Sequence, residues 1–333
     1  MRVLVTGGAG YIGSHAVYQL LEAGHEVAVI DSMVAGNPWA VPEKALFLKA
    51  DIADEQPVKK LFADFKPEAI MHFAAFVEVP ESVREPLKYY ENNFTKACRF
   101  IQMAVDAGIR RFVFSSTAAV YGTPEKNPIN ESAPVLPINP YGASKSFTER
   151  FLFDLAQIGK ISPIIFRYFN VAGARLDLKI GQARPNPFHL INVASEAALG
   201  LRPKLMMFGE DYQTKDGTCE RDYIHVEDLV AAHLLGLQHP LEIGKAEIFN
   251  LGYGHGFTVK EVIEVMQKLS EKGFPVEKAP RREGDPDSLV ADSSKAQKIL
   301  KWKPKHDDLE LICQTALNWE KKLIQIKAQG KRS

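Results

Sequence analysis

The sequence predicts an α/β fold in which a doubly wound parallel sheet is followed by a second, smaller mixed α/β domain. Over residues 1–170, short apolar runs alternate with segments of helical periodicity, as in parallel sheets whose strands are joined by helices. From residue 171 this alternation is interrupted by loops with Gly, Pro and scattered Arg. The length of 333 residues also favours two domains. We therefore expect a first domain over 1–170, joined by a returning strand near 245–251, and a second, interrupted domain over 171–333.

The first predicted element is a strand that runs directly into a glycine-rich turn. Arg2 to Thr6 form the apolar run, and Gly7, Gly10 and Gly13 follow at once. Apolar residues then recur at helical spacing until Gly24 ends the helix. Such a turn gathers backbone N–H groups and the positive end of a helix at one point, which a pyrophosphate can approach without meeting a Cβ atom. The pattern predicts a dinucleotide site.

An acidic residue at the end of the second strand defines the kind of dinucleotide. The strand Glu26 to Ile30 ends in Asp31, about 20 residues after the glycine turn. A carboxylate at this place hydrogen-bonds a ribose 2′-hydroxyl and repels a 2′-phosphate. The combination is typical of a Rossmann domain and favours NAD over NADP, whereas an unrelated tight turn with a surface acid would not explain both features.

The alternation of strands and helices continues to residue 170. Further strands are expected at 45–49, 69–73, 112–116 and 163–169, and helices at 57–65, 86–107 and 141–157. The carboxyl ends of parallel strands meet at one ligand-binding edge. We expect Asp51, Ala74, the segment 115–117 and Asn170 at this edge, and we interpret His72 as a packed core histidine.

A tyrosine and a lysine spaced by four residues are the predicted catalytic pair. A Pro-rich irregular loop over 123–140 leads into Tyr141, and helical periodicity follows. Positions 141 and 145 would then share one helix face. A cation close to a phenol lowers its pKa, so Lys145 could make Tyr141 a general base near neutral pH. Taken alone, the pair is more often a plain helix start with a solvated lysine, and only the surrounding pattern favours catalysis.

Composition excludes several other classes of function. Lys plus Arg and Asp plus Glu are equal at 41 each, so no net field favours nucleic acid or an anionic membrane. No stretch approaches the length of a membrane span. Cys98, Cys219 and Cys313 have no paired spacing, and we expect three buried thiols, no metal site and a cytoplasmic location.

Together, the glycine turn, Asp31, the segment 115–117 and the pair at 141 and 145 resemble the extended short-chain dehydrogenase/reductase family over most of the chain. Four later motifs narrow the resemblance to the UDP-glucose 4-epimerase branch of that family. They are Tyr168–Ala174, Asp216–Thr218, Arg221–Val226 and Arg281–Asp285. These motifs are more specific than the glycine turn.

The resemblance implies tightly held NAD and a UDP-sugar substrate, UDP-glucose or UDP-galactose. The catalytic residues it implies are Thr117, Tyr141 and Lys145. The cofactor-binding residues it implies are Gly7, Gly10, Tyr11, Ile12, Gly13, Asp31, Asp51, Ile52, Phe73, Ala74, Ala75, Asn92, Tyr141, Lys145 and Phe169. The substrate-binding residues it implies are Thr117, Tyr141, Asn170, His189, Leu190, Phe208, Arg221, Arg282, Asp285 and Leu289, with Phe208 near the uracil.

The reaction implied by the resemblance is reversible C4 epimerisation. Tyr141 removes the C4 hydroxyl proton while hydride passes to NAD, and Thr117 hydrogen-bonds the developing ketone. Lys145 depresses the phenol pKa and holds the nicotinamide ribose. The 4-keto sugar then turns about its phosphate link and takes the hydride back on its other face. Arginines suit the anchoring diphosphate because their planar fork binds phosphate bidentately.

Several positions depart from the family pattern. Thr117 replaces the usual serine, Val77 stands where some relatives have a lysine, and His189 stands where asparagine is frequent. Leu289 occupies a position whose size is thought to gate the C2 substituent, so acceptance of UDP-N-acetylglucosamine stays open.

The sequence also allows comparison with three functions other than UDP-glucose epimerisation. Ala118 and Ala119 follow Thr117 and argue against a 4,6-dehydratase, which needs an acid and a base there. An epimerase of UDP-glucuronate or a UDP-pentose, and a non-catalytic NAD-sensing regulator, remain alternatives.

The surplus apolar faces of helices 86–107 and 141–157 predict a homodimer joined by a four-helix bundle.

Overall fold

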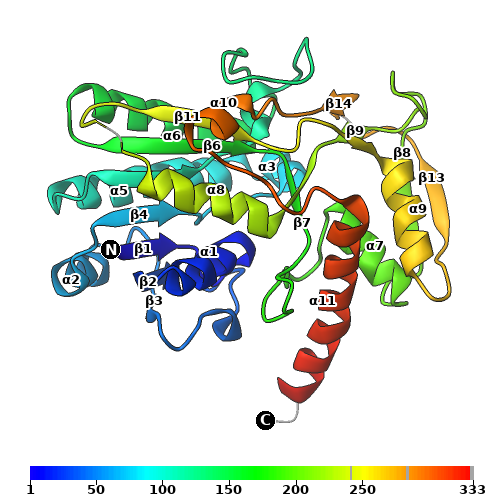
Figure 1. The fold of residues 1–333 in the computed structure, drawn as a ribbon, viewed down its shortest axis with the longest axis horizontal. Helices are drawn as coiled ribbons and strands as arrows, with labels where there is room; N and C mark the ends of the chain where they lie inside the picture. Colours follow the sequence, from blue (N-terminus) through cyan, green and yellow to red (C-terminus); the bar gives the residue numbers. More distant parts are fainter. Residues whose placement is uncertain (241, 283–284, 331–333) are drawn as a thin grey trace.

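The computed structural model describes residues 1–240, 242–282 and 285–330, and its main feature is a seven-stranded parallel sheet (Figure 1). Glu283 and Gly284 of the predicted 281–285 motif, and residues 331–333 of the predicted second domain, lie outside this range. The strand order is β11-β6-β5-β4-β1-β2-β3, which confirms the predicted doubly wound sheet. The strands are β1 (Arg2–Thr6), β2 (Glu26–Asp31), β3 (Leu46–Lys49), β4 (Ala69–His72), β5 (Arg111–Ser115), β6 (Ser162–Tyr168) and β11 (Glu247–Leu251).

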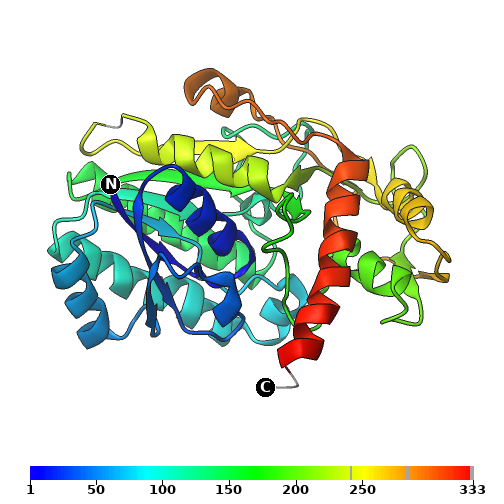
Figure 2. The ribbon, with the colours of Figure 1, turned by 60° about the horizontal axis from the view of Figure 1, so that its bottom comes forward.

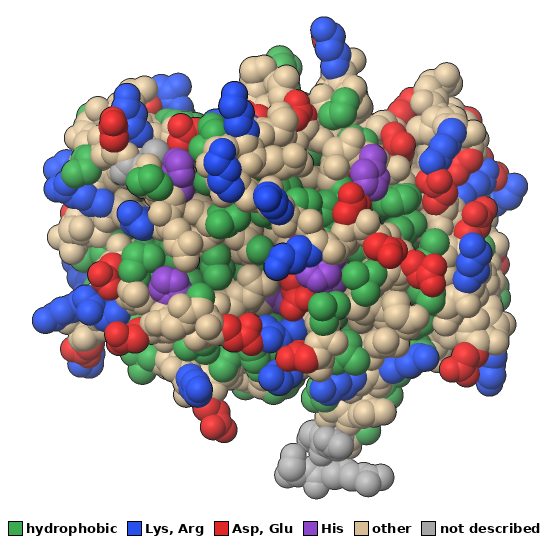
Figure 3. All heavy atoms as spheres, viewed as in Figure 1, with side chains coloured by type: hydrophobic (Ala, Val, Ile, Leu, Met, Phe, Trp, Pro, Cys, Tyr) green, Lys and Arg blue, Asp and Glu red, His purple; other side chains and the backbone are tan. Residues whose placement is uncertain are grey.

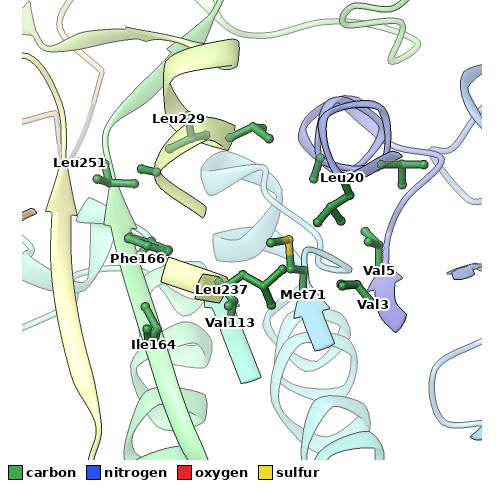
Figure 4. Packing of buried hydrophobic residues seen from close by; sticks show 14 of the residues in the cluster. Val3, Val5, Leu20, Met71, Val113, Ile164, Phe166, Leu229, Leu237 and Leu251 are labelled. Carbon is green, nitrogen blue, oxygen red and sulfur yellow. The ribbon is translucent and has the colours of Figure 1, made fainter. Parts of the chain in front are cut away.

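Helices cover both faces of the sheet because its strands are apolar on both sides. Helices α1 (Tyr11–Glu22) and α8 (Val226–Gln238) pack on one face. Figure 4 shows Leu20 of α1 and Leu229 of α8 directed at the sheet residues Met71 and Phe166. The opposite face is covered by α2 (Glu55–Phe65), α5 (Lys96–Asp106) and α6 (Pro140–Gln157).

The helix predicted over 86–107 is present in the structure, and its middle turn is a wider π-helical turn. It consists of α4 (Pro86–Tyr90), the π-helical turn η2 (Glu91–Thr95) and α5, and is preceded by α3 (Val79–Arg84). The wide turn frees the Asn93 carbonyl, which accepts a hydrogen bond from Thr148 Oγ1 at 2.9 Å. Single π turns of this kind are frequent at functional sites, and this one carries Asn92 and Asn93.

The second region is a smaller body beside the carboxyl edge of the sheet, with α11 running along the boundary (Figure 2). Its helices α7 (Leu190–Ala198), α9 (Val259–Leu269) and α11 (Leu309–Gly330) share one apolar cluster. Three small sheets and three further short helical segments complete the described part of the chain. They are β7 (Asn170–Ala172) with β10 (Tyr223–His225), β8 (Leu205–Phe208) with β13 (Val276–Ala279), β9 (Glu220–Arg221) with β12 (Phe257–Thr258) and β14 (Ser288–Leu289), η1 (Pro38–Ala40), η3 (Ala118–Tyr121) and α10 (Ser294–Ile299).

The visible surface is of mixed charge, and two of the three cysteines are buried. The face in Figure 3 carries Lys, Arg, Asp and Glu side chains interspersed, in keeping with the balanced composition. Among the described residues no helix combines the length and apolar character of a bilayer span. Cys219 and Cys313 are buried, as expected, but Cys98 on α5 is only half-buried, so the expectation of three buried thiols is wrong at that position.

Candidate active site

A cavity of about 1450 Å³ lies where the carboxyl edge of the sheet faces the second region. Gly7, Asp31 and Ser115 line it from strand ends of the sheet, while Phe208 and Arg221 line it from the second region. Every residue expected to bind cofactor or substrate is among its lining residues. Because a drug-sized ligand fills roughly 300 to 1,000 Å³, this volume suits two ligands held end to end.

The glycine turn provides a cradle in which side chains would clash. Gly7 has φ +70°, and a Cβ at that position would lie 2.7 Å from the Ala74 nitrogen. A Cβ on Gly13 would lie 2.2 Å from the Gly7 carbonyl oxygen. Because glycine has no Cβ, the turn can fold back against the end of β4. Helix α1 then begins at Tyr11, and the free N–H groups of its first turn face the cavity. The cradle fits the pyrophosphate of a dinucleotide.

Two acids stand at the adenosine end expected for such a dinucleotide. Asp31 is buried and its carboxylate accepts hydrogen bonds from Ala9 N (3.0 Å) and Met33 N (2.8 Å), which leaves lone pairs for ribose hydroxyls. Burial raises the pKa of Asp31. Asp51 forms a 2.5 Å ion pair with Lys96, a residue that sequence reasoning missed.

Tyr141 and Lys145 occupy the first turns of α6, as predicted. Asn139 caps this helix by accepting a hydrogen bond from Gly142 N at 2.9 Å, and Pro140 occupies the first turn. Both Tyr141 and Lys145 are more than nine-tenths buried. Thr117 follows β5, caps the short turn η3 (Ala118–Tyr121), and lies close enough to the Tyr141 phenol to lower its pKa. The three groups therefore meet at one point of the cavity wall.

The protonation of this pair differs from the expectation. Burial raises the pKa of Tyr141 to about 12, and the nearby Thr117 side chain lowers it only partly. Burial also lowers the pKa of Lys145 to about 7. Lys145 Nζ donates to the Ser115 carbonyl oxygen at 2.7 Å. The expected shift of the phenol toward neutrality is absent: desolvation raises its pKa, and the opposing influence comes from Thr117 and not from Lys145.

The end of the cavity formed by the second region carries two arginines with different partners. The Arg221 guanidinium contacts the Pro286 carbonyl oxygen (2.9 Å) and Asp285 Oδ1 (3.3 Å), so Asp285 lies directly beside the arginine. The Arg282 guanidinium lies 4.0 Å from the centre of the Phe208 ring. Thus Asp285 orients Arg221, and Arg282 covers a face of the ring expected to lie near the uracil.

The remaining predicted substrate residues line the same end. His189 directly precedes α7 and its ring lies against the Phe188 ring; burial and the nearby Arg184 lower its pKa to about 4, so it is neutral at pH 7. Leu190 begins α7, Asn170 begins β7, and Leu289 lies half-buried in β14.

His72 is the packed core histidine that the sequence predicts. It is buried, its Nδ1 lies 2.9 Å from Thr6 Oγ1, and its ring stacks on Phe100 and Phe114. Burial lowers the pKa of His72 to about 3, which keeps the ring neutral at physiological pH. This histidine therefore supports the sheet and offers no charge to the cavity.

Sequence reasoning missed three further contacts around the cavity. Arg184 pairs with Glu78 at 3.1 Å between segments more than one hundred residues apart, and no motif marks either residue. Tyr168 hydrogen-bonds Ser115. A buried cluster of Ser116, Glu149 and Arg167 lies behind Thr117 and Lys145, and in the sequence only the spacing of Lys145 and Glu149 indicated it. The two other scattered arginines, Arg175 and Arg281, pair with acids away from the cavity.

Comparison with known proteins identifies the chain's family. The model of the NAD dependent epimerase/dehydratase family matches residues 3–252. The chain belongs to the NAD dependent epimerase/dehydratase family. A UDP-glucose 4-epimerase of Azospirillum brasilense is 48% identical to this family member over 99% of the chain and 94% of the relative.

Two solved structures of similar proteins extend the comparison. A UDP-glucose-4-epimerase of Stenotrophomonas maltophila, with bound NAD and formylated UDP-arabinopyranose, is 37% identical with a TM-score of 0.94. The alignment covers 98% of this epimerase/dehydratase family member and 99% of that chain. A UDP-Glc/GlcNAc 4-epimerase of Campylobacter jejuni is 48% identical with a TM-score of 0.84, over 96% and 99% of the two chains.

Proposed function

We propose that this protein catalyses the reversible, NAD-dependent C4 epimerisation of UDP-glucose and UDP-galactose through a transient 4-keto sugar. The observation that carries the proposal is one cavity in which a dinucleotide cradle and a cluster of arginines meet at Tyr141, Lys145 and Thr117. The names of relatives aligned over nearly the full chain support the same reaction.

The cofactor end is assigned to residues of the sheet edge. We propose that the glycine turn holds the pyrophosphate, that Asp31 binds the adenosine ribose, and that Lys145 faces the nicotinamide ribose. Bound NAD supplies the electron-pair acceptor for oxidation at C4 and returns the pair for reduction. The further cavity residues assigned to this cofactor are Tyr11, Ile12, Asp51, Ile52, Phe73, Ala74, Ala75, Asn92 and Phe169.

Proton transfer is assigned to Tyr141. The phenolate form of Tyr141 takes the proton of the C4 hydroxyl, and the phenol so formed gives it back after the sugar has turned. Thr117 Oγ1 donates to the oxygen at C4 and so stabilises the ketone. Since the phenol of the unliganded protein has a pKa of about 12, the Lys145 ammonium must be charged and close for this transfer to be rapid.

The diphosphate of the substrate is assigned to Arg221 and Arg282. Both line the cavity, and Asp285 fixes the guanidinium of Arg221. We propose that binding draws Arg282 from the Phe208 ring to a phosphate, which frees the ring for the uracil. A diphosphate held at a fixed point lets the keto sugar turn over without leaving the cavity.

One experiment tests the assignment. Purified protein is extracted for NAD and incubated with UDP-galactose, and UDP-glucose formation is followed for the wild type and Tyr141→Phe. We expect bound NAD in both proteins and a rate loss of about 10²- to 10⁴-fold in the variant, the usual contribution of general acid–base catalysis. A variant as fast as wild type would overturn the role of Tyr141, and a wild type without turnover would favour the NAD-sensing regulator.

A second candidate substrate is UDP-N-acetylglucosamine. Leu289 is intermediate in size and half-buried at the cavity wall, and the Campylobacter jejuni protein is named a UDP-Glc/GlcNAc 4-epimerase. We propose that the cavity admits the N-acetyl group. A panel of UDP-glucose, UDP-N-acetylglucosamine, UDP-glucuronate and UDP-arabinose separates the alternatives. No turnover of UDP-N-acetylglucosamine would contradict this proposal, and turnover of UDP-glucuronate above UDP-glucose would contradict the assignment of UDP-glucose as substrate.

We also propose that two copies of the chain associate through α4, η2, α5 and α6. Leu87 is 83% exposed and Phe147 is 48% exposed on this surface, and Tyr90 and Phe94 pack against Phe147. Exposed apolar side chains clustered on adjacent helices are typical of an interface. Two such pairs of helices would form the predicted four-helix bundle.

Two further assignments remain proposals. The unpaired thiols of Cys98, Cys219 and Cys313 support a reducing compartment, and we propose a cytoplasmic location without nucleic-acid partners. We propose residues 1–170 with the strand near 245–251 as the NAD-binding domain, and residues 171–333 as the UDP-sugar-binding domain. Parallel pairing of β11 with β6 supports this division.

A further inference from the structure

A buried ion pair lies directly behind the catalytic groups. Glu149 on α6 and Arg167 on β6 are each only 3% exposed. The carboxylate of Glu149 accepts from Arg167 Nε at 3.0 Å and from Arg167 Nη2 at 2.5 Å. Desolvating two charges is costly, and such a pair seldom stabilises a fold more than apolar residues of the same volume would.

The pair is also incompletely satisfied. The second amino group of the guanidinium, Arg167 Nη1, is buried without a hydrogen-bond partner among the described residues. A buried donor without a partner costs free energy. Stability alone therefore does not explain why two charges occupy this place.

The pair reaches the catalytic loop through two contacts. Ser116, the residue before Thr117, donates its hydroxyl to Glu149. Its backbone N–H donates to the Phe166 carbonyl oxygen at 2.8 Å. At the other end of η3, the Arg167 guanidinium lies 4.9 Å from the centre of the Tyr121 ring. Glu149 and Arg167 thus hold both ends of the segment that carries Thr117.

The same carboxylate lies one helical turn after Lys145. Both side chains are buried on the same face of α6. Three further ionisable groups surround Lys145: His72 of β4, Tyr168 of β6 and Tyr141 of α6 itself. Strand β5 adds two groups that do not ionise, the Phe114 ring and the Ser115 carbonyl.

Glu149 is the one acid with a resolved influence on the Lys145 ammonium. Among the described residues no other carboxylate raises the pKa of Lys145, which burial lowers to about 7. The imidazole of His72 is neutral at physiological pH because burial lowers its pKa to about 3. The phenols of Tyr141 and Tyr168 are neutral as well, so the negative charge near Lys145 comes from Glu149.

We propose that Glu149, anchored by Arg167, is a positioning residue that fixes Thr117 through Ser116 and supplies the negative charge that favours the ammonium form of Lys145. The proposal rests on the proposed epimerase function and adds to it a residue that touches neither cofactor nor substrate. It separates two effects of one carboxylate, a geometric effect on Thr117 and an electrostatic effect on Lys145.

The test compares the pH dependence of three variants with wild type. Glu149→Gln keeps the shape but removes the charge, so the alkaline limb of kcat and the fall of NAD affinity in calorimetry should both move about one pH unit lower. Ser116→Ala removes only the link to Thr117, so kcat should fall about tenfold with unchanged KM and unchanged pH midpoints. Asp154→Asn, which breaks the exposed Arg150–Asp154 pair of the same helix, is the matched control and should change neither.

The outcomes distinguish this inference from the function on which it rests. A wild type that binds NAD but turns over no UDP-sugar defeats the proposed function, while the pH midpoint of NAD binding still reports on Glu149. An active wild type with identical midpoints in Glu149→Gln defeats the inference. If Glu149→Gln does not fold, the double variant Glu149→Gln/Arg167→Gln replaces it, because it leaves no unpaired guanidinium in the core. pH midpoints of this double variant equal to those of wild type would again defeat the inference.

Discussion

Lys145 illustrates what a single buried cationic side chain costs in folding stability. Its side chain is 2% exposed, its Nζ has one backbone acceptor, and burial lowers its pKa to about 7. An unfolded chain has an ordinary lysine whose pKa is about 10.4. Folding at pH 6 must therefore bury an ammonium that water would solvate better.

We predict that Lys145→Met stabilises the NAD-free protein while abolishing turnover. Below pH 7 both states of the wild type hold the proton, so the full cost of burial applies and the variant should gain roughly 1 to 3 kcal/mol. Between pH 7 and 10 the unfolded wild type binds the additional proton, so wild-type stability rises with pH and the gain shrinks. Urea unfolding followed by circular dichroism at pH 6 and pH 9 measures both values, and a gain that grows with pH would contradict the assignment.

At this scale, residue spacing predicted which side chains lie at the cavity, but it did not predict their protonation states. Tyr141, Lys145 and Asp31 follow from spacing to a helix start or a strand end, because those positions fix where side chains point. The direction of the Tyr141 pKa shift could not be predicted, since it depends on how completely the cavity wall excludes water from the phenol. Arg184 and Glu78 likewise meet only through tertiary packing.

Among the elements, the helices with one apolar face were predictable and the helix buried on most sides was not. Helix α8 packs against α1 and completes the helical layer on one face of the sheet. Its sequence is apolar on several sides and shows no amphipathic period. The small strands β9, β12 and β14 were also missed, because two-residue strands are set by their partners rather than by their own sequence.

Helix α11 shows how one aromatic residue can brace two loops that border the cavity. Trp319 is 1% exposed, its Nε1 donates to the Gln182 carbonyl at 2.7 Å, and its ring faces Trp39 at 5.6 Å between centroids. A Cβ on Gly181 would lie 2.5 Å from the ring. The indole thus clamps the loop before α7 and the loop after Asp31.

We predict that Trp319→Ala costs about 3 to 5 kcal/mol of unfolding free energy, as expected for a buried indole. Because both clamped loops border the cavity, NAD affinity should fall as well. Thermal unfolding and calorimetric titration with NAD measure the two effects. Gln325→Ala, on the exposed face of the same helix, serves as control; an equal loss there would mean that the helix rather than the indole matters.

At the scale of the whole molecule, the Glu78–Arg184 pair joins the sheet to the second region across the cavity. The side chains are 25% and 21% exposed, so solvent screens the pair only in part. We predict a coupling of about 0.5 to 1 kcal/mol between them in UDP-sugar affinity. A double-mutant cycle with Glu78→Gln and Arg184→Gln measures it, and additive losses would show that the pair does not link the two regions during binding.

The proposed dimer makes a separate prediction. Phe147→Glu places a charge in the exposed aromatic cluster of α4, η2 and α6, so it should convert the dimer into a folded monomer. Sedimentation velocity at micromolar concentration measures the change. Leu201→Glu, at an apolar side chain that is 52% exposed away from these helices, should remain dimeric, and a wild-type monomer would refute the interface.

The pairing of β11 with β6 also bears on how the protein is made. The strand that covers the outer edge of Ser162–Tyr168 is encoded only at Glu247–Leu251, after the chain has left the sheet and returned. A ribosome that has translated the first 170 residues therefore carries a nascent chain with an open apolar sheet edge. Such edges template aggregation, so we expect this chain to depend on chaperones during synthesis until its third quarter has emerged.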